Sequence, residues 1–342
     1  MKPVRIAVVG LGYWGPQLAR NVFECADAEL AVVCDARPDA LAQIARRYPG
    51  IPQTTEYAEV LADDTVDAVM IATPISTHYE LGRAALDAGK HTFVEKPLAG
   101  SLAEATRLAE LASELGLVLM PGHTFVYSPP VQAIRELIAS GALGDIYFVS
   151  TSRVNLGLHQ SDASVIWDLG PHDFSILSYW LDEPPVRVHA LSRGCVMPET
   201  PDVAFIQLEY GSGVIANVEL AWLAPSKLRR TTVVGSHKMV VYDDTSVESV
   251  RVFDSGVDLR DPETFGEYRL SYRTGDIVSP RIAAAEPLGL ELEDFCAAIR
   301  TGSALRSSAR LGVEVVRIVE AAERSLTVGG GVSVPFAATP IQ

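Results

Sequence analysis

The stretch VVGLGYWGPQLARN, residues 8–21, decides the fold of this chain. It follows a β-rich run, Val4–Val9, and opens a segment with a helical pattern. Gly10 permits a tight turn, Gly12 lets the backbone approach a pyrophosphate, and Gly15 lets the helix pack closely on the strand. The N-terminus of that helix also favours the charge of a phosphate group. We therefore expect a dinucleotide-binding turn at the start of the chain.

An acidic residue stands where such a turn needs one. Asp35 ends the next β-like run, Leu30–Cys34, about 20 residues after Gly15. A carboxylate there accepts hydrogen bonds from both ribose hydroxyls and repels a 2′-phosphate, which favours NAD. NADP is the alternative, because Arg37 could offset that repulsion. A second alternative is that Asp35 only caps the following helix.

The first third of the chain alternates between apolar runs and helical patterns. The expected strands are Val4–Val9, Leu30–Cys34, Asp67–Thr73, His91–Glu95 and Leu117–Met120, and the expected helices are Gly15–Cys25, Pro38–Tyr48, Ser76–Ala88 and Ser101–Leu115. Continuous apolar runs are typical of strands buried on both faces. This alternation predicts an α/β Rossmann domain with a doubly wound parallel sheet, which we assign to residues 1–124.

After about residue 125 the rhythm changes to closely spaced strands. They are expected at Phe148–Arg153, Arg187–Leu191, Ala204–Tyr210, Val214–Leu220, Arg230–Val234 and Met239–Tyr242. The turn 211–213 between two of them predicts a hairpin. We expect an α+β domain over residues 125–342, with a large, mostly antiparallel open sheet. Helices at Pro171–Leu181, Leu290–Thr301 and Leu311–Leu326 would cover that sheet or pack back on the first domain, and Arg251–Gly289 is expected to be irregular.

Composition limits the partners of the protein. The net charge of −15 disfavours nucleic acid and anionic membranes. No apolar run has the length of a membrane span, and the apolar run after Met1 is too short for a signal peptide. The four cysteines have no metal-binding spacing, and no metal is expected. A cytoplasmic protein is the expectation.

Two strand ends carry candidate site residues in "ATPISTHYELGRAALDAGKHTFVEKPLAG", residues 72–100. Thr73-Pro74 and Lys96 each follow a strand, so both should lie at the carboxyl edge of the sheet, where ligands bind in such folds. Pro97 disfavours helical geometry at Lys96 and would hold the direction of the lysine. The alternative for Lys96 is a side chain that extends to solvent. Ser76 is expected to cap a helix whose first turn contains His78.

The second domain contains "VIWDLGPHDFSIL", residues 165–177. Asp168 and His172 stand four positions apart, and a helix that begins near Pro171 would place His172 in its first turn. A carboxylate near an imidazole can orient it and stabilise its cation, and histidine is suited to general-base catalysis near neutral pH. The alternative is that the acidic residues cap the helix and that His172 is a histidine of the core.

These motifs together resemble one family. GLGYWG (10–15), ATP (72–74), EKP (95–97) and the Asp168–His172 pair are similar to the glucose–fructose oxidoreductase and inositol dehydrogenase (Gfo/Idh/MocA) family, over nearly the whole chain. The resemblance implies hydride transfer between a nicotinamide and a ring alcohol of a sugar or cyclitol. It implies that Lys96 hydrogen-bonds the reacting oxygen, that His172 transfers its proton, and that Asp168 binds a neighbouring hydroxyl or steadies His172. It also implies a homo-oligomer, a dimer or tetramer, built through the second-domain sheet.

The resemblance extends to the residues expected around each ligand. Cofactor contacts are expected from Gly10, Gly12, Tyr13, Trp14, Gly15, Asp35, Arg37, Thr73, Pro74, His78, Glu95, Lys96 and Trp167. Substrate contacts are expected from Lys96, His123, Tyr127, Arg153, Asn155, Asp168, His172 and Lys227.

Longer stretches narrow the expected substrate. Residues 12–21, 153–173, 222–244 and 286–295 look most like dehydrogenases that oxidise carbon 3 of nucleotide-linked sugars. A UDP- or dTDP-linked hexose is therefore expected, with Lys227 near its phosphate or a sugar carboxylate, although Lys227 could instead be a solvated edge lysine. The alternatives are a simple sugar or inositol dehydrogenase and a keto-sugar reductase that runs in the opposite direction. A protein of another class, a nicotinamide-binding regulator without catalysis, also remains open.

Overall fold

The computed structural model describes residues 2–157, 159, 163–259 and 270–334, which form two compact units. The first comprises the described residues within Met1–Ser128 and Ala285–Arg317, and the second those within Pro129–Ala284 and Ile318–Phe336. The first compact unit therefore combines the chain up to residue 128 with a later segment. Each unit is described by itself.

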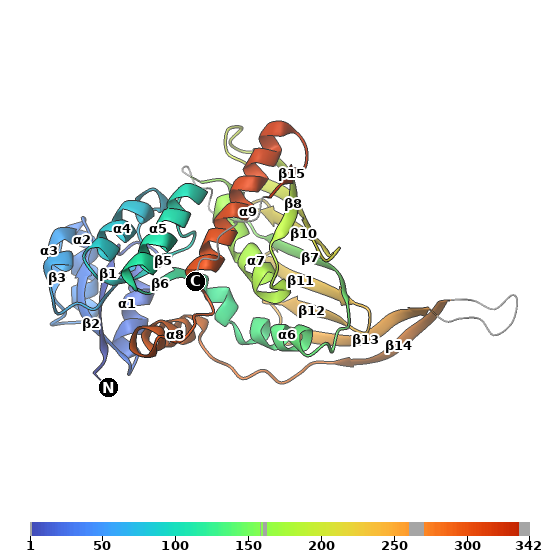
Figure 1. The fold of residues 1–342 in the computed structure, drawn as a ribbon, viewed down its shortest axis with the longest axis horizontal. Helices are drawn as coiled ribbons and strands as arrows, with labels where there is room; N and C mark the ends of the chain where they lie inside the picture. The colour runs from blue at the N-terminus through green and yellow to red at the C-terminus, as the bar shows by residue number, and fades with distance from the viewer. Residues whose placement is uncertain (1, 158, 160–162, 260–269, 335–342) are drawn as a thin grey trace, which may run out of the picture. The chain divides into compact units, whose positions relative to one another are not determined.

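The first unit is built on a six-stranded parallel sheet with the order β3-β2-β1-β4-β5-β6 (Figure 1). Its strands are β1 (Val4–Val9), β2 (Ala28–Cys34), β3 (Gln53–Thr54), β4 (Ala68–Ile71), β5 (His91–Glu95) and β6 (Leu119–Gly122). The helices are α1 (Gly15–Glu24), α2 (Pro38–Arg47), α3 (Tyr57–Ala62), α4 (His78–Asp87), α5 (Leu102–Leu115) and α8 (Pro287–Thr301). Helices α4 and α5 pack together on one side of the sheet, and α1 packs with α8 on the other. The predicted doubly wound parallel sheet is confirmed.

Local sequence explains both ends of α5. Ser101 caps α5, because its hydroxyl accepts a hydrogen bond from the Glu104 backbone N–H at 3.2 Å, and Gly116 ends the helix with a left-handed φ of 65°. The predicted cap at Ser76 is wrong. The chain first makes a short 3₁₀ turn, η1 (Ile75–Thr77), and α4 begins only at His78.

The second unit is built on a nine-stranded sheet with the order β14-β13-β12-β11-β7-β10-β9-β8-β15. Its strands are β7 (Ile146–Val154), β8 (Pro185–Arg193), β9 (Val203–Tyr210), β10 (Ile215–Ala221), β11 (Leu228–Gly235), β12 (Met239–Asp243), β13 (Val250–Leu259), β14 (Leu270–Val278) and β15 (Val332–Ser333). Neighbouring strands are antiparallel except β7 and β10, which are parallel. The expected large, mostly antiparallel sheet is confirmed.

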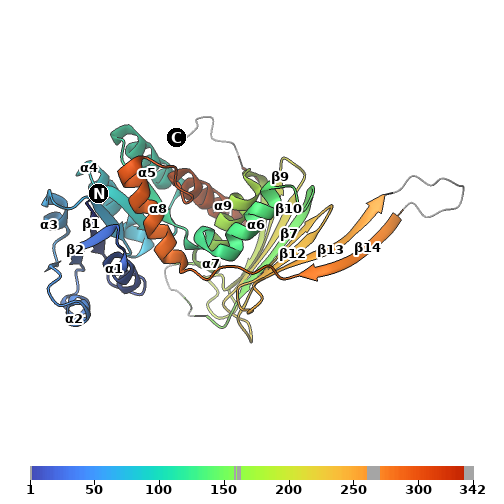
Figure 2. The same cartoon turned by 90° about the horizontal axis from the view of Figure 1, so that it is seen from below.

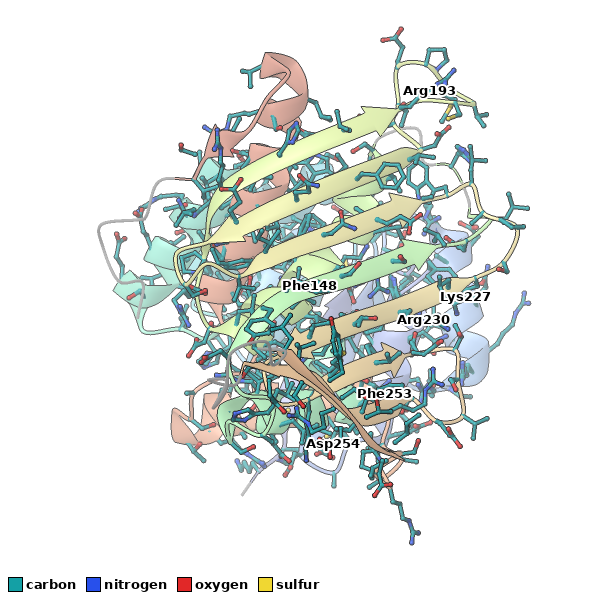
Figure 3. All side chains as sticks on the ribbon, turned by 90° about the vertical axis from the view of Figure 1, so that its right-hand side faces the viewer. Phe148, Arg193, Lys227, Arg230, Phe253 and Asp254 are labelled. Atoms are coloured by element: carbon teal, nitrogen blue, oxygen red, sulfur yellow. The ribbon has the colours of Figure 1, made fainter. Side chains whose placement is uncertain are left out.

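Helices cover one face of this sheet and leave the other open. Figure 2 shows α6 (Pro129–Ala139), α7 (Val165–Leu181) and α9 (Ala309–Val328), the last of these from Ile318 onward, on the same side. Figure 3 looks onto the opposite side, which carries Phe148; its cross-strand neighbours are Ile215 on β10 and Val234 on β11. The burial of β7 follows this division, because Val149 and Thr151 are buried while Phe148 is 45% exposed.

The expectation that Arg251–Gly289 is irregular is wrong for the strands β13 and β14, although residues 279–286 are irregular as expected and residues 260–269 lie outside the described part of the chain. Strands β13 and β14 form a hairpin at the edge of the sheet (Figure 1). The sequence of the hairpin lacks the usual alternation of apolar and polar residues because charged side chains take the place of apolar ones. Arg273 on β14 contacts Asp254 at 3.1 Å and Asp258 at 2.7 Å on β13. Such cross-strand ion pairs can hold a ribbon whose faces are both in water.

Helix α7 also begins earlier than predicted. It begins at Val165, with Asp168 in its first turn, and Pro171 lies inside it. Proline lacks the N–H that would bond to the carbonyl of Trp167. Because such an N–H has no partner in the first turn of a helix, Pro171 suggested that the helix begins there. The consequence is that Asp168 and His172 lie on one helix, one turn apart.

The described residues contain neither a membrane-spanning helix nor a metal-binding cluster. Within them, no helix combines the length and apolar character needed to cross a membrane. In the same residues, histidine, cysteine and carboxylate side chains form no group of three suited to hold a metal ion.

Candidate active site

The glycine turn joins β1 to α1 and has the geometry of a dinucleotide cradle. Gly10 has a φ of 88°, and a Cβ on Gly15 would lie 1.9 Å from the carbonyl oxygen of Gly10, so neither position tolerates a side chain. A Cβ on Gly12 would meet none of the described atoms within 4 Å. The backbone at Gly12 is therefore open to a ligand, beside the N-terminus of α1. Tyr13 and Trp14 flank it, both exposed, with their rings edge to face at 5.5 Å.

Asp35 closes this cradle from the end of β2. Its carboxylate accepts hydrogen bonds from the backbone N–H of Leu11 at 2.6 Å and of Arg37 at 2.8 Å. The Arg37 guanidinium adds two contacts at 3.1 Å, and the arginine itself is exposed. Burial raises the pKa of Asp35, but the bonds from Arg37 and Leu11 outweigh it and hold the pKa below its ordinary value. Asp35 is therefore an anion at the place where a ribose diol would bind, which fits a dinucleotide.

The loops after β4 and β5 meet at the same edge of the sheet. The two strands are neighbours, with Ile71 opposite Val94. The methyl group of Thr73 lies against Gly10, since a Cβ on Gly10 would come within 2.7 Å of it, and Pro74 is exposed beside Thr73. Lys96 follows β5, is half-buried, and joins Pro97 through a cis peptide bond. The first unit thus brings Thr73 and Lys96 to the edge that carries the glycine turn.

Glu95 lies buried directly before the lysine. Its carboxylate accepts a hydrogen bond from the backbone N–H of Lys96 at 3.2 Å. Burial raises the pKa of Glu95 to about 7, against the opposing effect of the Lys96 ammonium. Glu95 therefore lies beneath the loop, and its burial limits its contact with a cofactor.

Three other expected ligand contacts are fully buried in the first unit. His78 is 1% exposed, and His123 and Tyr127 are 0% exposed. The Tyr127 hydroxyl donates to the Asp294 carboxylate at 2.7 Å and accepts from the Ser307 N–H at 3.0 Å. Burial and the nearby Lys96 lower the pKa of His123 to about 3, so its ring is neutral. In this structure these side chains have no exposed surface to offer a cofactor or substrate.

Helix α8 supplies partners that the sequence did not reveal. Glu291 accepts a hydrogen bond from the Thr124 hydroxyl at 2.7 Å, and Asp294 accepts the one from Tyr127. These acidic residues stand three apart, on one face of α8. Their spacing in the sequence indicates that both lie on one face of a helix. It does not reveal their partners, which lie some 170 residues earlier in the chain.

The second unit presents Asp168 and His172 from α7. The Asp168 carboxylate accepts a hydrogen bond from the indole N–H of Trp222 at 3.0 Å, which fixes its direction. His172 is half-buried one turn further on. Trp222 follows β10 and was not expected to act in the site. The expected cofactor contact Trp167 is half-buried, and its side chain is hydrogen-bonded to Glu323 on α9.

Arg153, expected to bind substrate, is instead buried in an ion pair. Its guanidinium donates to the Asp173 carboxylate at 2.5 Å, and the Thr151 hydroxyl donates to the same carboxylate at 2.7 Å. The ion pair connects β7 to α7, because Asp173 lies on α7 directly after His172. Asn155 lies just beyond β7, half-buried, with its backbone N–H bonded to the Ala221 carbonyl at 3.1 Å.

The basic cluster before β11 divides in the structure. Arg229 pairs with Asp244 and Arg230 with Asp243, each at 3.0 Å. Lys227 is exposed at the start of the strand, and we find no ion pair for it in the part of the chain that the structure describes (Figure 3). Lys227 is therefore the member of the cluster that remains available to a ligand.

Comparison with known proteins gives the class and the family. Residues 4–123 match the profile of an oxidoreductase family with an NAD-binding Rossmann fold, and residues 131–241 match the GFO/IDH/MocA C-terminal domain. The class is therefore that of oxidoreductases with an NAD-binding Rossmann domain. The chain belongs to the glucose–fructose oxidoreductase and inositol dehydrogenase (Gfo/Idh/MocA) family, as its motifs indicated.

Three similar proteins illustrate the range of this family. The scyllo-inositol 2-dehydrogenase (NAD(+)) of Bacillus subtilis strain 168 is 32% identical over 235 residues, which cover 65% of this chain and 68% of that protein. The structure of GenD2 from gentamicin A biosynthesis, in complex with NAD, matches with a TM-score of 0.83 at 26% identity. The match covers 98% of this chain and 97% of the GenD2 chain. The UDP-N-acetylglucosamine 3-dehydrogenase GnnA of Acidithiobacillus ferrooxidans matches with a TM-score of 0.80 at 24% identity. The match covers 96% of this chain and 99% of the GnnA chain. At that identity GnnA shows the shared fold alone.

Proposed function

We propose that the protein is an NAD-dependent dehydrogenase that oxidises a secondary ring alcohol of a sugar, with Lys96, His172 and Asp168 as its catalytic group. The observation that carries the proposal is the position of Lys96 at the strand edge that also bears the glycine turn. A nicotinamide, when bound, supplies the acceptor or donor of hydride.

The chain's own residues handle the oxygen and its proton. When hydride leaves the carbon, negative charge develops on the alcohol oxygen, and the Lys96 ammonium stabilises it through a hydrogen bond. The hydroxyl proton passes to the imidazole of His172, which acts as general base. Asp168, held by the Trp222 indole, accepts a hydrogen bond from a neighbouring hydroxyl or from the imidazole. In the reverse direction, His172 returns the proton to a ketone oxygen.

The proposed substrate is a UDP- or dTDP-linked hexose oxidised at carbon 3. Lys227 supports this choice, because it is an exposed cation at the start of β11 in a chain of net charge −15. A charge-assisted bond to a phosphate contributes on the order of 1.5–3 kcal/mol. The longer stretches shared with nucleotide-sugar 3-dehydrogenases support the same choice.

Inositol or a simple sugar is the second candidate substrate. The observation that favours it is the 32% identity to a scyllo-inositol 2-dehydrogenase. A cyclitol carries no phosphate, so Lys227 would then be a solvated lysine with no contact to the substrate.

A substrate panel with two variants separates these candidates. Reduced cofactor would be followed by absorbance with UDP- and dTDP-hexoses, free glucose, myo-inositol and scyllo-inositol, in both directions. We expect activity on a nucleotide-linked hexose, and a KM about tenfold or more higher in Lys227→Ala. Lys238→Ala, beyond the other end of β11, is the matched control and should leave KM unchanged. Equal efficiency on free sugar or inositol, unaffected by Lys227→Ala, would identify a simple sugar or cyclitol dehydrogenase instead.

A further inference from the structure

His78 occupies a position between the two loops that form the strand edge. It is the first residue of α4 and is 1% exposed. Its Nδ1 lies 2.8 Å from the carbonyl oxygen of Pro97, and its Nε2 lies 2.9 Å from the carbonyl oxygen of Thr73. Thr73 and Pro97 each stand two residues beyond the end of a strand, β4 and β5 respectively. One imidazole ring therefore spans both loops.

The chemistry of the two contacts makes the ring a connector rather than a ligand contact. A carbonyl oxygen only accepts hydrogen bonds, whereas a neutral imidazole carries one N–H and an imidazolium carries two. Burial lowers the pKa of His78, the two carbonyls raise it, and the Lys96 ammonium lowers it further. A neutral ring donates to one carbonyl, and its unprotonated nitrogen faces the other carbonyl oxygen without a hydrogen bond, whereas a protonated ring donates to both. In either state its two nitrogens are directed at backbone of the two loops.

The two loops differ in what they carry. Thr73 touches Gly10 through its methyl group, so its loop is fixed to the glycine turn. The Thr77 hydroxyl, directly before His78, contacts the Thr73 hydroxyl at 2.7 Å and so holds the same loop to the start of α4. Pro97 directly follows Lys96, so a shift of the Pro97 carbonyl would move the lysine backbone.

We propose that His78 is a positioning residue that sets Lys96 relative to the glycine turn by tying the loop after β5 to the loop after β4. Its effect on turnover rests on the proposed role of Lys96, but its effect on the position of Lys96 does not. An approach that is wrong by about 1 Å can cost about a hundredfold in rate, so a small change in this loop has a large effect on catalysis.

The test measures the environment of Lys96 directly. The lysines of the chain are Lys2, Lys90, Lys96, Lys227 and Lys238, few enough for reductive ¹³C-methylation to give resolved NMR signals, with Lys96→Arg to assign one of them. We expect His78→Leu to shift the Lys96 signal and its titration midpoint while the Lys227 and Lys238 signals stay in place. His78→Gln keeps a side-chain amide that can donate one hydrogen bond, so its shift should be intermediate.

A matched histidine controls for the loss of any ring from this unit. His91 begins β5 at the opposite end of the strand and accepts a hydrogen bond from the Val118 N–H at 3.0 Å. His91→Asn should leave the Lys96 signal unchanged. An unchanged Lys96 signal in both His78 variants overturns the proposal.

Turnover then separates this proposal from the proposed function. Lys96→Ala should lower kcat by roughly 10²–10³-fold with little change in NAD affinity. His78→Leu should lower kcat about tenfold or more, and should add little in the Lys96→Ala background, because both changes affect the same group. Full additivity would mean that His78 acts through another group and would overturn the proposal. A shifted Lys96 signal together with normal turnover in Lys96→Ala would support the role of His78 and reject that of Lys96.

Discussion

Asp35 carries two roles that compete for the same oxygens. Its carboxylate already accepts hydrogen bonds from the backbone of Leu11 and from Arg37, yet the ribose of NAD needs the same group. The exposed Arg37 side chain can swing away, whereas the Leu11 N–H is part of the glycine turn. Cofactor choice at this position is therefore a balance between the Asp35 charge and the Arg37 guanidinium.

This balance predicts a preference for NAD. In a direct titration, we expect the wild-type protein to bind NAD more tightly than NADP, because the Asp35 anion repels a 2′-phosphate. Asp35→Ala should weaken NAD binding about tenfold or more, as expected for the loss of charge-assisted bonds. Asp39→Ala, in the first turn of α2, is the control and should change neither affinity. Tighter binding of NADP by the wild type would instead make Arg37 a phosphate ligand.

His172 predicts the pH dependence of alcohol oxidation. A general base accepts a proton only as a neutral imidazole, so the rate should rise with pH as the ring loses its proton. His172→Asn should lose most activity and also this rise, with NAD affinity as the control measurement. Near-normal activity in the variant would return His172 to a structural role.

Glu95 predicts a pH dependence of stability that is independent of activity. Its folded-state pKa is about 7, above the ordinary 4.5, so its contribution to stability is complete below pH 4.5 and is lost as the pH rises through 7. Glu95→Gln mimics the neutral carboxyl and does not titrate. From pH 4.5 to 8, the free energy of unfolding of the wild type should therefore fall by about 3 kcal/mol relative to the variant. Denaturant titrations at several pH values would measure this difference, and parallel curves would contradict it.

At the scale of elements, the buried Arg153–Asp173 pair fixes α7 against β7. Removing one partner of a buried ion pair typically costs 3–5 kcal/mol, roughly, because the other charge stays buried. We expect Arg153→Ala to lower the free energy of unfolding by about that amount. Arg229→Ala breaks the more exposed pair with Asp244 and should cost about 1 kcal/mol or less. Urea denaturation of both variants tests the difference, and a loss of about 1 kcal/mol or less in Arg153→Ala would contradict the expectation.

The same elements show what sequence could predict and what it could not. The β1–α1–β2 unit was predictable because its signals are local: an apolar run, three glycines and an acidic residue. The start of α7 was missed because Pro171 usually marks a helix start, and β13 and β14 were missed because ion pairs replaced their apolar alternation. Alternation placed Arg153 on one face of β7, but its partner Asp173 belongs to a helix that only the tertiary fold brings near.

The burial of expected ligand contacts has a similar cause. The family resemblance named His78, His123 and Tyr127 as ligand contacts, and in the structure they follow the ends of β4 and β6. The Tyr127 side chain is held inward by a later segment, α8, through Asp294, whereas His78 is held between Thr73 and Pro97. Proximity to the site was local information, whereas access to it depended on distant residues.

At the scale of the whole molecule, the open face of the nine-stranded sheet is the expected contact between copies of the chain. Phe148, Phe205 and Ile215 are exposed on adjacent strands of that sheet, which is an unusual grouping for a surface in water. We expect a dimer or tetramer in solution, measured by sedimentation, and dissociation in Phe148→Glu. Val328→Glu, at the end of α9, also places a charge at an exposed apolar position and is the control that should keep the assembly intact. A monomeric wild type would contradict this expectation.

The interrupted first unit has a consequence for how the protein is made. When a ribosome has added residue 128, all six strands of the parallel sheet exist, but α8 does not. Phe93 then lacks Phe295, its ring partner at 6.1 Å, and Tyr127 lacks the Asp294 carboxylate. The entire nine-stranded sheet except β15 is synthesised before those partners emerge. The nascent Rossmann sheet must therefore keep an uncovered apolar flank for more than 150 further residues, and a nonsense codon before residue 285 would leave that flank permanently exposed to chaperones and proteases.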